Sequence, residues 1–515
     1  MLDYLRRLAT TGFAYTSASV LSKLIALVTL PIYTGLLTTS EYGQAEVMFG
    51  GVVAVSIFVR FGLMEALLRF YYLPEEDGDD VVRSGFAGMF WATTLFAVVL
   101  LPFASLISEP LHSEPGLVRI AIGGLWLLTL YEYLLTLLRI DERAKAYFVF
   151  TVVHVLVAIP LTILLLVGFD LGAEALLLGS YASGIPFVAY LAITERRRLA
   201  LVWQRSLIRR MLRFGLPTMP AELSLYLLNF VDRIILVAVI GPAAVGLYAV
   251  AFKFSQAVQI FVRGFQLAWP PLAYSITDDN EARRVYSVVT TIFTATCGLI
   301  VVAVWLEARW ITDILAASDF ADAYKAVGLL ALGGSLYGVY LALLVILGRT
   351  GRTEFNFPAT LAALAINIGL NILLVPDHGI VGAGIALVAA YGAAVIIMFL
   401  FTQRLFPVPY QWGRLLVIAV GAAGLIAAGE LLLPTEGIEG LALRLIPIAL
   451  YPVVLWVGAT TAPERVQIRA LAHPAVLRAR LAEVRERGEA AGDRARSGEE
   501  YLRTETLDED LRDRF

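Results

Sequence analysis

Two lysines in long apolar stretches are the residues of this sequence best suited to binding an anion. Lys23 and Lys253 each lie about 12 to 15 Å along a predicted membrane-spanning helix, at about 1.5 Å per residue. A charge near the middle of a bilayer costs about 2.5 to 3.5 kcal/mol on insertion scales and usually faces a cavity. Only four of the 40 basic residues are lysines, and two of the four sit at this depth. We therefore expect both to face a central cavity rather than lipid.

Two arginines form a second basic pair. Arg60 and Arg263 each lie about 24 to 28 Å from the outer end of a predicted span. At that depth a guanidinium can reach the inner headgroups by snorkelling. It can equally capture an anionic ligand at the inner mouth of a cavity. The sequence leaves both interpretations open.

Three acidic residues in the same stretches are candidates for sodium or proton coupling. Glu132 lies between two tyrosines, and Glu222 follows Pro220 in a span that Pro217 already interrupts. Asp232 lies near the outer end of that span, where pairing with a neighbouring helix is the alternative. The sequence contains no phosphate-binding Walker loop, zinc-ligand cluster or nucleophile motif. It therefore predicts neither an enzyme nor a cofactor other than such a coupling ion.

The composition requires a membrane to hold these residues. The chain has 515 residues, of which 59% are hydrophobic and 16% charged, with a mean hydropathy of +0.77. Soluble domains are about half apolar and about a quarter charged. The net charge of -3 offers no electrostatic footprint for a nucleic acid. The single cysteine, Cys297, cannot form an internal disulfide.

Fourteen apolar stretches have the length of about 20 residues that a bilayer core of about 30 Å requires. The first is too long for the apolar region of a secretory signal and lacks a cleavage site, which predicts a retained span. The predicted spans are 13–37, 44–72, 85–108, 117–139, 147–169, 173–193, 214–240, 245–268, 288–307, 324–348, 357–376, 379–402, 412–433 and 441–460.

The loop charges predict the orientation of these spans, because cytoplasmic loops carry an excess of basic residues. With the N-terminus inside, nineteen basic residues fall in inner loops and four in outer loops. The even number of spans then places the C-terminus inside as well. We interpret the charged C-terminal segment as a solvated tail without a dedicated role. The expected domains are an N-terminal lobe at 1–196, a basic linker at 197–213, a C-terminal lobe at 214–404, two further spans at 405–462 and the tail at 463–515.

An internal repeat predicts that the two lobes are related. The tetrapeptide Ile57–Arg60 recurs 203 residues later as Ile260–Arg263, and Gly172 and Tyr181 match Gly382 and Tyr391 at an offset of 210. Six-span units start on the same side of the membrane, so an axis along the membrane normal relates them. The predicted fold is an all-α polytopic membrane protein: fourteen transmembrane helices, arranged as two pseudo-symmetric six-helix bundles plus two C-terminal helices. Such proteins are typically alternating-access carriers.

Three short motifs resemble those of bacterial Wzx-type polysaccharide flippases. The main motif runs from Asn229–Arg233, with its Asp-Arg pair, to the Val-Gly-Leu-Tyr turn at 245–248. The segments Leu30–Gly43 and Asn371–Ala383 are also similar to that family. The resemblance covers residues 10–460 and extends to the multidrug/oligosaccharidyl-lipid/polysaccharide exporter superfamily. It leaves out the charged tail.

The resemblance implies a function and a set of partners. A Wzx-like flippase moves undecaprenyl-diphosphate-linked oligosaccharide to the outer leaflet of the inner (plasma) membrane, for assembly into O-antigen, capsule or exopolysaccharide. Lys23, Lys253, Arg60 and Arg263 would then bind the diphosphate in a cationic cavity, while the lipid tail stays in the bilayer. A polysaccharide polymerase and chain-length machinery are the expected protein partners. The alternatives are a lipid II flippase, a multidrug or cation antiporter, a major-facilitator carrier, or a membrane polymerase or glycosyltransferase.

Overall fold

The computed structural model describes residue 21, residues 25–202, residues 204–460 and residue 465. Within these residues the secondary structure is helical, without a strand. Eleven helical segments are long and apolar enough to cross a membrane. They are Thr39–Val59, Gly78–Ser108, Pro115–Ile140, Ala144–Phe169, Ala173–Thr194, Pro242–Ser275, Asp279–Leu306, Ser318–Arg349, Asn356–Leu405, Trp412–Leu432 and Gly437–Gly458.

The helix bounds show where the predicted spans are interrupted. In chain order the α-helices are α2 (Thr39–Val59), α3 (Leu63–Phe70), α4 (Gly78–Leu100), α5 (Ala104–Ser108), α6 (Pro115–Ile140), α7 (Ala144–Phe169), α8 (Ala173–Ala182), α9 (Ile185–Thr194), α10 (Arg205–Gly215), α11 (Met219–Leu228), α12 (Val231–Val239), α13 (Pro242–Ser275), α14 (Asp279–Leu306), α15 (Ala308–Leu315), α16 (Tyr324–Arg349), α17 (Asn356–Leu405), α18 (Trp412–Leu432) and α19 (Gly437–Gly458).

The observed helices are consistent with the predicted fourteen spans. α17 consists of two helices joined at Gly379, whose φ of 56° and ψ of -132° are not helical, so it provides spans eleven and twelve. The shorter apolar helix Ile25–Leu36 belongs to the first predicted span. α11 and α12 together belong to the seventh. The prediction of an all-α polytopic membrane protein is confirmed.

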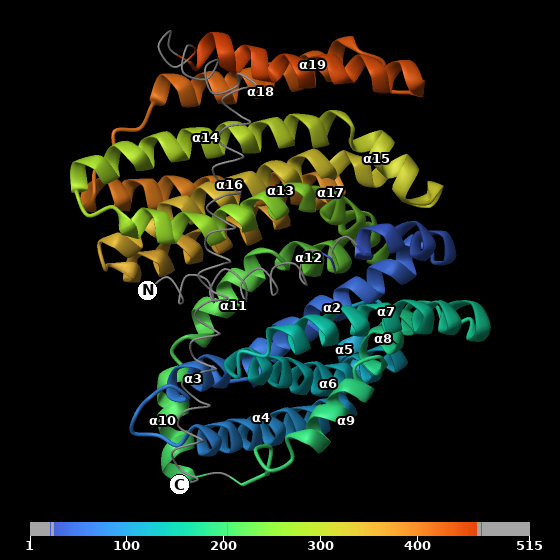
Figure 1. Cartoon of the computed structure of the whole chain (residues 1–515). Helices are drawn as coiled ribbons and strands as arrows, with labels where there is room; N and C mark the ends of the chain where they lie inside the picture. The colour runs from blue at the N-terminus through green and yellow to red at the C-terminus, as the bar shows by residue number, and fades with distance from the viewer. Residues whose placement is uncertain (1–20, 22–24, 203, 461–464, 466–515) are drawn as a thin grey trace, which may run out of the picture.

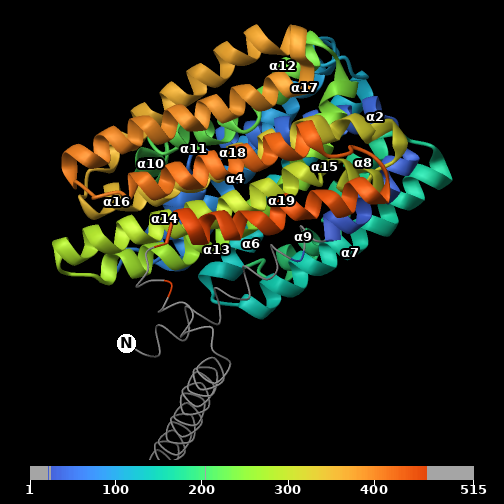
Figure 2. The same cartoon turned by 90° about the horizontal axis from the view of Figure 1, so that it is seen from above.

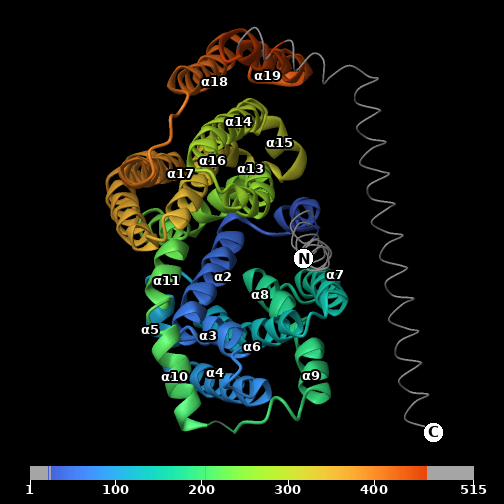
Figure 3. The same ribbon diagram turned by 60° about the vertical axis from the view of Figure 1, so that its left-hand side comes forward.

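The helices form two bundles side by side (Figure 1). One contains α2 to α9, and the other contains α13 to α17, with α11 and α12 between them (Figures 1 and 3). α18 and α19 pack outside the second bundle against α14, where Tyr451 is fully buried and donates a hydrogen bond to the carbonyl of Ala295 at 3.3 Å. Seen from above, the spans share one general direction (Figure 2). The exact domain boundaries given above stay predictions.

Two predicted spans are interrupted, one where the sequence suggested continuous helix and one at Pro217, where the sequence predicts an interruption. The second span, predicted at 44–72, is interrupted between α2 and α3, because Phe61 and Gly62 have φ values of 50° and 67°. The start of the seventh, predicted at 214–240, is interrupted between α10 and α11. The two breaks pack against each other: a Cβ on Gly62 would lie 2.1 Å from the carbonyl oxygen of Gly215. Only glycine permits this approach of the two backbones.

One end of the bundle is held together by ion pairs. We call the end with the α6–α7 and α9–α10 loops the basic end. There the Arg198 guanidinium contacts Asp79 at 2.9 Å and Asp141 at 2.8 Å. The hydrogen bonds that the Arg198 guanidinium donates to the Asp141 carboxylate raise the pKa of Arg198 above its already high usual value. α10 runs across the spans at this end (Figure 1), and its own residues Leu207 and Met211 are buried.

We expect Arg198→Ala to lower the stability of the basic end. The substitution leaves the carboxylates of Asp79 and Asp141 without their shared cation. Hydrogen bonds to charged groups contribute about 1.5 to 3 kcal/mol each, and partial exposure reduces this, so we expect a loss of about 2 kcal/mol. Thermal unfolding of the purified protein measures it. Arg197→Ala is the control, because that neighbouring side chain is exposed; equal melting temperatures for the two variants would contradict this role.

At the opposite end, the two bundles meet through a close contact of α2 and α13. A Cβ on Gly43 would lie 1.8 Å from the carbonyl oxygen of Pro242, and one on Gly246 would lie 2.1 Å from that of Thr39. Two helix backbones can therefore touch here. In the structure this contact joins the two bundles at the opposite end.

Gly43→Leu should force α2 and α13 apart, because the added side chain overlaps backbone atoms that cannot rotate away. We expect the opposite end to open at least partly, with greater labelling of cysteines introduced beside the contact. Gly35→Leu is a matched control, since its Cβ would meet nothing within 4 Å. Labelling that stays at the wild-type level in Gly43→Leu would show that this contact does not hold the end closed.

Candidate functional site

The seventh span is broken again in its middle, between α11 and α12. α11 ends at Leu228 and α12 begins at Val231, so Asn229 and Phe230 are not helical. At the break, backbone groups lack the hydrogen-bond partners that a continuous helix would provide. One of them, the carbonyl of Asn229, accepts a hydrogen bond from Nη1 of Arg233 at 2.7 Å. Irregular backbone inside a membrane is tolerated where it lines a cavity, and discontinuous helices commonly form transporter binding sites.

Arg233 is the central cation of this break. It is 7% exposed, and its guanidinium carbon lies 4.6 Å from the Phe252 ring centroid and 5.4 Å from that of Tyr248. Aromatic faces attract a desolvated cation by up to about 2 kcal/mol. The contacts place the guanidinium next to α13 of the second bundle. Among the described residues, its side chain donates hydrogen bonds through Nη1 alone.

Asp232 is only a weak partner of Arg233. Its Oδ1 is 3.7 Å from Nη1 of Arg233 and instead accepts the backbone N–H of Arg233 at 2.9 Å. Its Oδ2 accepts the hydroxyl of Tyr248 on α13. Asp232 therefore has the contact with a neighbouring helix that the sequence offered as the alternative to ion coupling. Its role in ion coupling stays a prediction.

A tyrosine of α17 completes the polar surroundings of the break. The hydroxyl of Tyr391 donates to Oδ1 of Asn229 at 2.7 Å. Its ring centroid lies 5.3 Å from that of Tyr337 on α16. Tyr391 is one of the residues in the internal repeat. The break is thus tied to α17 as well as to α13.

A cavity of about 310 Å³ lies between α2, the α11–α12 break and α13. Its walls combine two opposite charges with aromatic and small residues: Glu46, Phe49, Gly50, Val53, Tyr226, Asn229, Phe230, Arg233 and Phe252. α2 belongs to the first bundle and α13 to the second. The cavity, which we call the central pocket, is therefore shared by both bundles.

Lys253 lies beside the central pocket and is paired with its acidic wall. Its Nζ is 2.7 Å from Oε1 of Glu46 and donates a hydrogen bond to the hydroxyl of Tyr42. It also lies 4.7 Å from the Tyr42 ring centroid. The pair connects α2 with α13, and thus one bundle with the other. Anion binding by Lys253 stays a prediction, with the added feature that Glu46 already compensates the charge. Lys23 lies outside the described residues.

Arg60 connects the bundles nearer the basic end. Its Nη1 is 2.9 Å from Oε2 of Glu132 on α6, and its Nη2 is 3.5 Å from Oε1 of Glu222 on α11. The Arg60 side chain is 12% exposed. Both interpretations of Arg60 treated it as a free cation, whereas the structure places two carboxylates on it. The structure thus brings together three residues that the sequence suggested separately.

Arg263, the counterpart of Arg60 in the repeat, has different surroundings. It lies within the continuous helix α13, is exposed, and donates a hydrogen bond to Oε1 of Gln266 at 3.0 Å. The repeat therefore preserves the residue but not its partners. Its proposed contact with an anion stays a prediction.

Sequence reasoning missed two of the charged residues in the central pocket. Arg233 appears in the quoted motif, but only Asp232 was selected from that pair. Glu46 lies four residues after Tyr42, so both face the same side of α2, and this spacing could have marked it. Lys253 could not be matched to Glu46 from the sequence, because the two are 207 residues apart.

The arrangement can bind an anion and can respond to it. Arg233 is buried and offers guanidinium N–H groups to the central pocket, and hydrogen bonds from such a cation to an anion are strong. Two ion pairs between helices lie at different heights along α2: Lys253–Glu46 near its start and Arg60–Glu222 at its end. Within the described residues, no group of three or more His, Cys, Asp or Glu side chains could hold a metal ion.

The model of the polysaccharide biosynthesis protein family matches residues 8–276, which is more than half of the chain. An uncharacterized membrane protein of Methanocaldococcus jannaschii is 23% identical over 72% of this chain and 79% of its own length. A probable low-salt glycan biosynthesis flippase of Haloferax volcanii is 23% identical over 40% of this chain and 44% of its own length.

Solved transporter structures share the fold. The lipid II flippase MurJ in an inward closed conformation superposes with a TM-score of 0.68 at 14% identity, over 87% of this chain and 98% of that one. An inward-facing multidrug resistance MATE transporter gives 0.62 at 17% identity, over 77% and 95%. A transporter from Pyrococcus furiosus described by the reverse polarity of its binding pocket gives 0.56 at 17% identity, over 80% and 95%. These neighbours are transporters and flippases rather than enzymes.

Proposed function

The chain belongs to the polysaccharide biosynthesis protein family, and we propose that it is a flippase for oligosaccharide linked to undecaprenyl diphosphate. The direction is from the cytoplasmic to the outer leaflet of the inner membrane, with the basic end and both termini in the cytoplasm. The product would supply O-antigen, capsule or exopolysaccharide assembly. A polysaccharide polymerase and chain-length machinery would be its partners.

One observation carries the proposal: buried Arg233 lies at a mid-membrane helix break, in a pocket shared by two bundles. A diphosphate presents several oxygens that match the planar guanidinium donors. Desolvation strengthens that contact and penalises a lipid without the anionic group. The flippase named among the relatives and the fold of MurJ support this class of substrate.

The ion pairs suggest how binding and movement are coupled. An anion that enters the central pocket lies beside Glu46 and competes with it for Lys253. Loss of the Lys253–Glu46 pair removes a polar contact between α2 and α13, which favours opening of the opposite end. Glu132 and Glu222 are the proposed ion-coupling residues, because protonation of Glu222 would release Arg60 from α11. An ion gradient or consumption of product would supply direction.

The proposal is tested with purified protein in lipid vesicles. The substrate is a fluorescent oligosaccharide linked to undecaprenyl diphosphate, and quenching from outside reports the leaflet. We expect the protein to accelerate its crossing at least about ten-fold over empty vesicles. A cationic dye serves as the probe for the multidrug antiporter alternative. Transport of the dye without the lipid-linked sugar would contradict the proposed function.

A further inference from the structure

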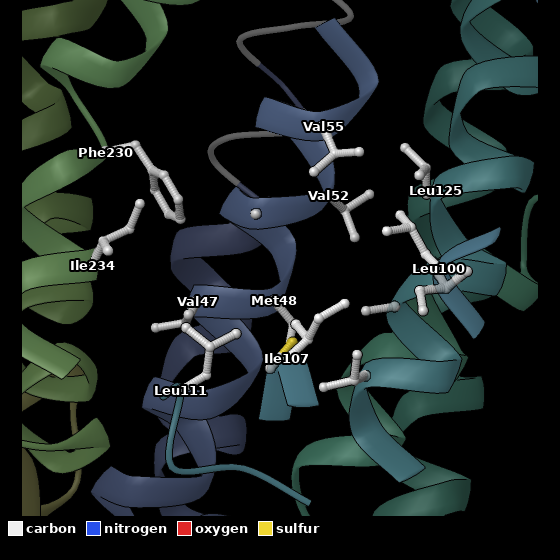
Figure 4. A pocket seen from close by; sticks show the side chains of 14 residues that line it. Val47, Met48, Val52, Val55, Leu100, Ile107, Leu111, Leu125, Phe230 and Ile234 are labelled. Carbon is white, nitrogen blue, oxygen red and sulfur yellow. The ribbon is translucent and has the colours of Figure 1, made fainter. Parts of the chain in front are cut away.

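A second cavity lies next to the central pocket and is lined by apolar groups. It has a volume of about 230 Å³. α2, the end of α4, α5, α6 and α12 surround it (Figure 4). We call it the apolar pocket. Its walls are formed by Val47, Met48, Gly51, Val52, Val55, Leu100, Ile107, Leu111, Val118, Ala121, Ile122, Leu125, Phe230 and Ile234.

The apolar pocket adjoins the central pocket along two helices. On α2, Glu46 and Gly50 line the central pocket, and the next residues in the chain, Val47 and Gly51, line the apolar pocket. On α12, Arg233 lines one and Ile234 the other. Phe230 lines both, and its ring packs so closely on Gly50 that a Cβ there would lie 1.8 Å from it.

The apolar pocket also reaches the surface of the helix bundle. Ile234 is 38% exposed, whereas Phe230 is 4% exposed. The lining residues of α2 come from the middle of a span, so the surrounding medium at this depth is hydrocarbon. A hydrocarbon chain that enters at Ile234 from the bilayer would not cross water.

The geometry points to a binding site for the isoprene units nearest the diphosphate of a polyprenyl diphosphate, an inference that rests on the proposed function. The two pockets side by side have the polarity of such a lipid: an anion-binding part against an apolar part. A cavity of about 150 Å³ holds a benzene ring, so 230 Å³ accommodates a short hydrocarbon segment. The rest of the chain stays in the bilayer.

The pocket contributes to binding through its shape, and transfer of the lipid chain from bilayer to pocket contributes little free energy. Lipid tails are as apolar as leucine side chains, so moving a chain from bilayer to pocket brings little solvation energy. The covalent link sets the requirement instead. When the diphosphate contacts Arg233, the first isoprene units would lie against Phe230, which lines both pockets. A filled pocket would displace the headgroup from its donors.

Gly51 allows the pocket to be filled without disturbing the helix packing. Its Cβ would meet nothing within 4 Å, and the residue lines the pocket. Gly51→Leu therefore adds a side chain to the cavity. Gly123→Leu is the matched control, since Gly123 is also helical, has open space at its Cβ and is exposed outside the pocket. Ala121→Leu fills the same pocket from α6.

The test measures binding of undecaprenyl diphosphate to the full chain in detergent by native mass spectrometry, with inorganic diphosphate as a probe without a chain. Melting temperatures establish that each variant is folded. We expect Gly51→Leu to weaken undecaprenyl diphosphate binding about ten-fold, or about 1.4 kcal/mol. Gly123→Leu should stay within about two-fold, and inorganic diphosphate should bind all variants equally. If Gly51→Leu does not fold, Ala121→Leu provides the same comparison.

Three results would overturn the inference. Unchanged undecaprenyl diphosphate binding in Gly51→Leu, with loss of a co-purified phospholipid, would assign the pocket to an acyl chain. Equal weakening of inorganic diphosphate would place the effect on the headgroup. Failure of the wild-type protein to bind undecaprenyl diphosphate would overturn the proposed function and this inference together. This outcome differs from the first two because it appears without any substitution in the pocket.

Discussion

Arg233→Gln is expected to reduce transport of the lipid-linked oligosaccharide about 100-fold. The glutamine keeps a donor for the Asn229 carbonyl but removes the charge and the planar fork that face the central pocket. Hydrogen bonds from a cation to an anion contribute about 1.5 to 3 kcal/mol each, and 3 kcal/mol corresponds to about 100-fold. Initial rates of leaflet exchange in vesicles measure the effect.

Two further variants separate the charge from the fold. Arg233→Lys keeps the charge without bidentate geometry and should recover part of the rate. Arg404→Gln removes an exposed arginine at the basic end of α17 and should transport like the wild type. Thermal melting establishes whether each variant is folded. Full transport by a folded Arg233→Gln would mean that the diphosphate does not use this guanidinium.

Exchanging the charges of Glu46 and Lys253 should restore stability but not transport. Each single substitution, Glu46→Lys or Lys253→Glu, puts like charges together in a contact where the two side chains are 20% and 30% exposed. We expect each to lose transport almost completely. The double substitution restores an attractive pair, and we expect a coupling energy of about 2 kcal/mol, within the range for directly contacting residues.

Transport distinguishes a structural pair from one that also meets the ligand. In the double variant the cation lies on α2 and the carboxylate on α13, which reverses the pair that the anion is proposed to disturb. Melting temperatures and leaflet exchange are measured on all four proteins. Additive stability changes would show that the pair does not join the bundles, and a fully transporting double variant would remove Lys253 from the ligand site.

Much of the fold could be predicted because it depends on local composition. The length of apolar stretches predicts spans wherever the helix is continuous, as for α6, α16 and α18. The interruption at Pro217 could be predicted from the proline, whereas the breaks at Gly62 and at Asn229 could not. The contact between the backbones of Gly62 and Gly215 requires glycine at both positions. The residues around each glycine do not mark it as a contact site.

The site could be predicted only in part, because charge partners come from distant segments. Arg60, Glu132 and Glu222 were each selected for their depth, but their grouping depends on the packing of α2, α6 and α11. The sequence therefore indicated which cations could bind an anion, but it did not indicate which carboxylates balance those cations. The structure moves the emphasis from Lys253 to Arg233, whose Asp232 neighbour hydrogen-bonds elsewhere.

The most direct measurement compares the binding of undecaprenyl diphosphate and of undecaprenol, which lacks the anion, to wild-type protein and to Arg233→Gln. The account predicts that the wild type prefers the diphosphate about 100-fold, and that Arg233→Gln reduces this preference to about ten-fold or less. Equal preference in the two proteins, with both folded, would contradict the claim that the helix break at Asn229 and Arg233 forms the anion site.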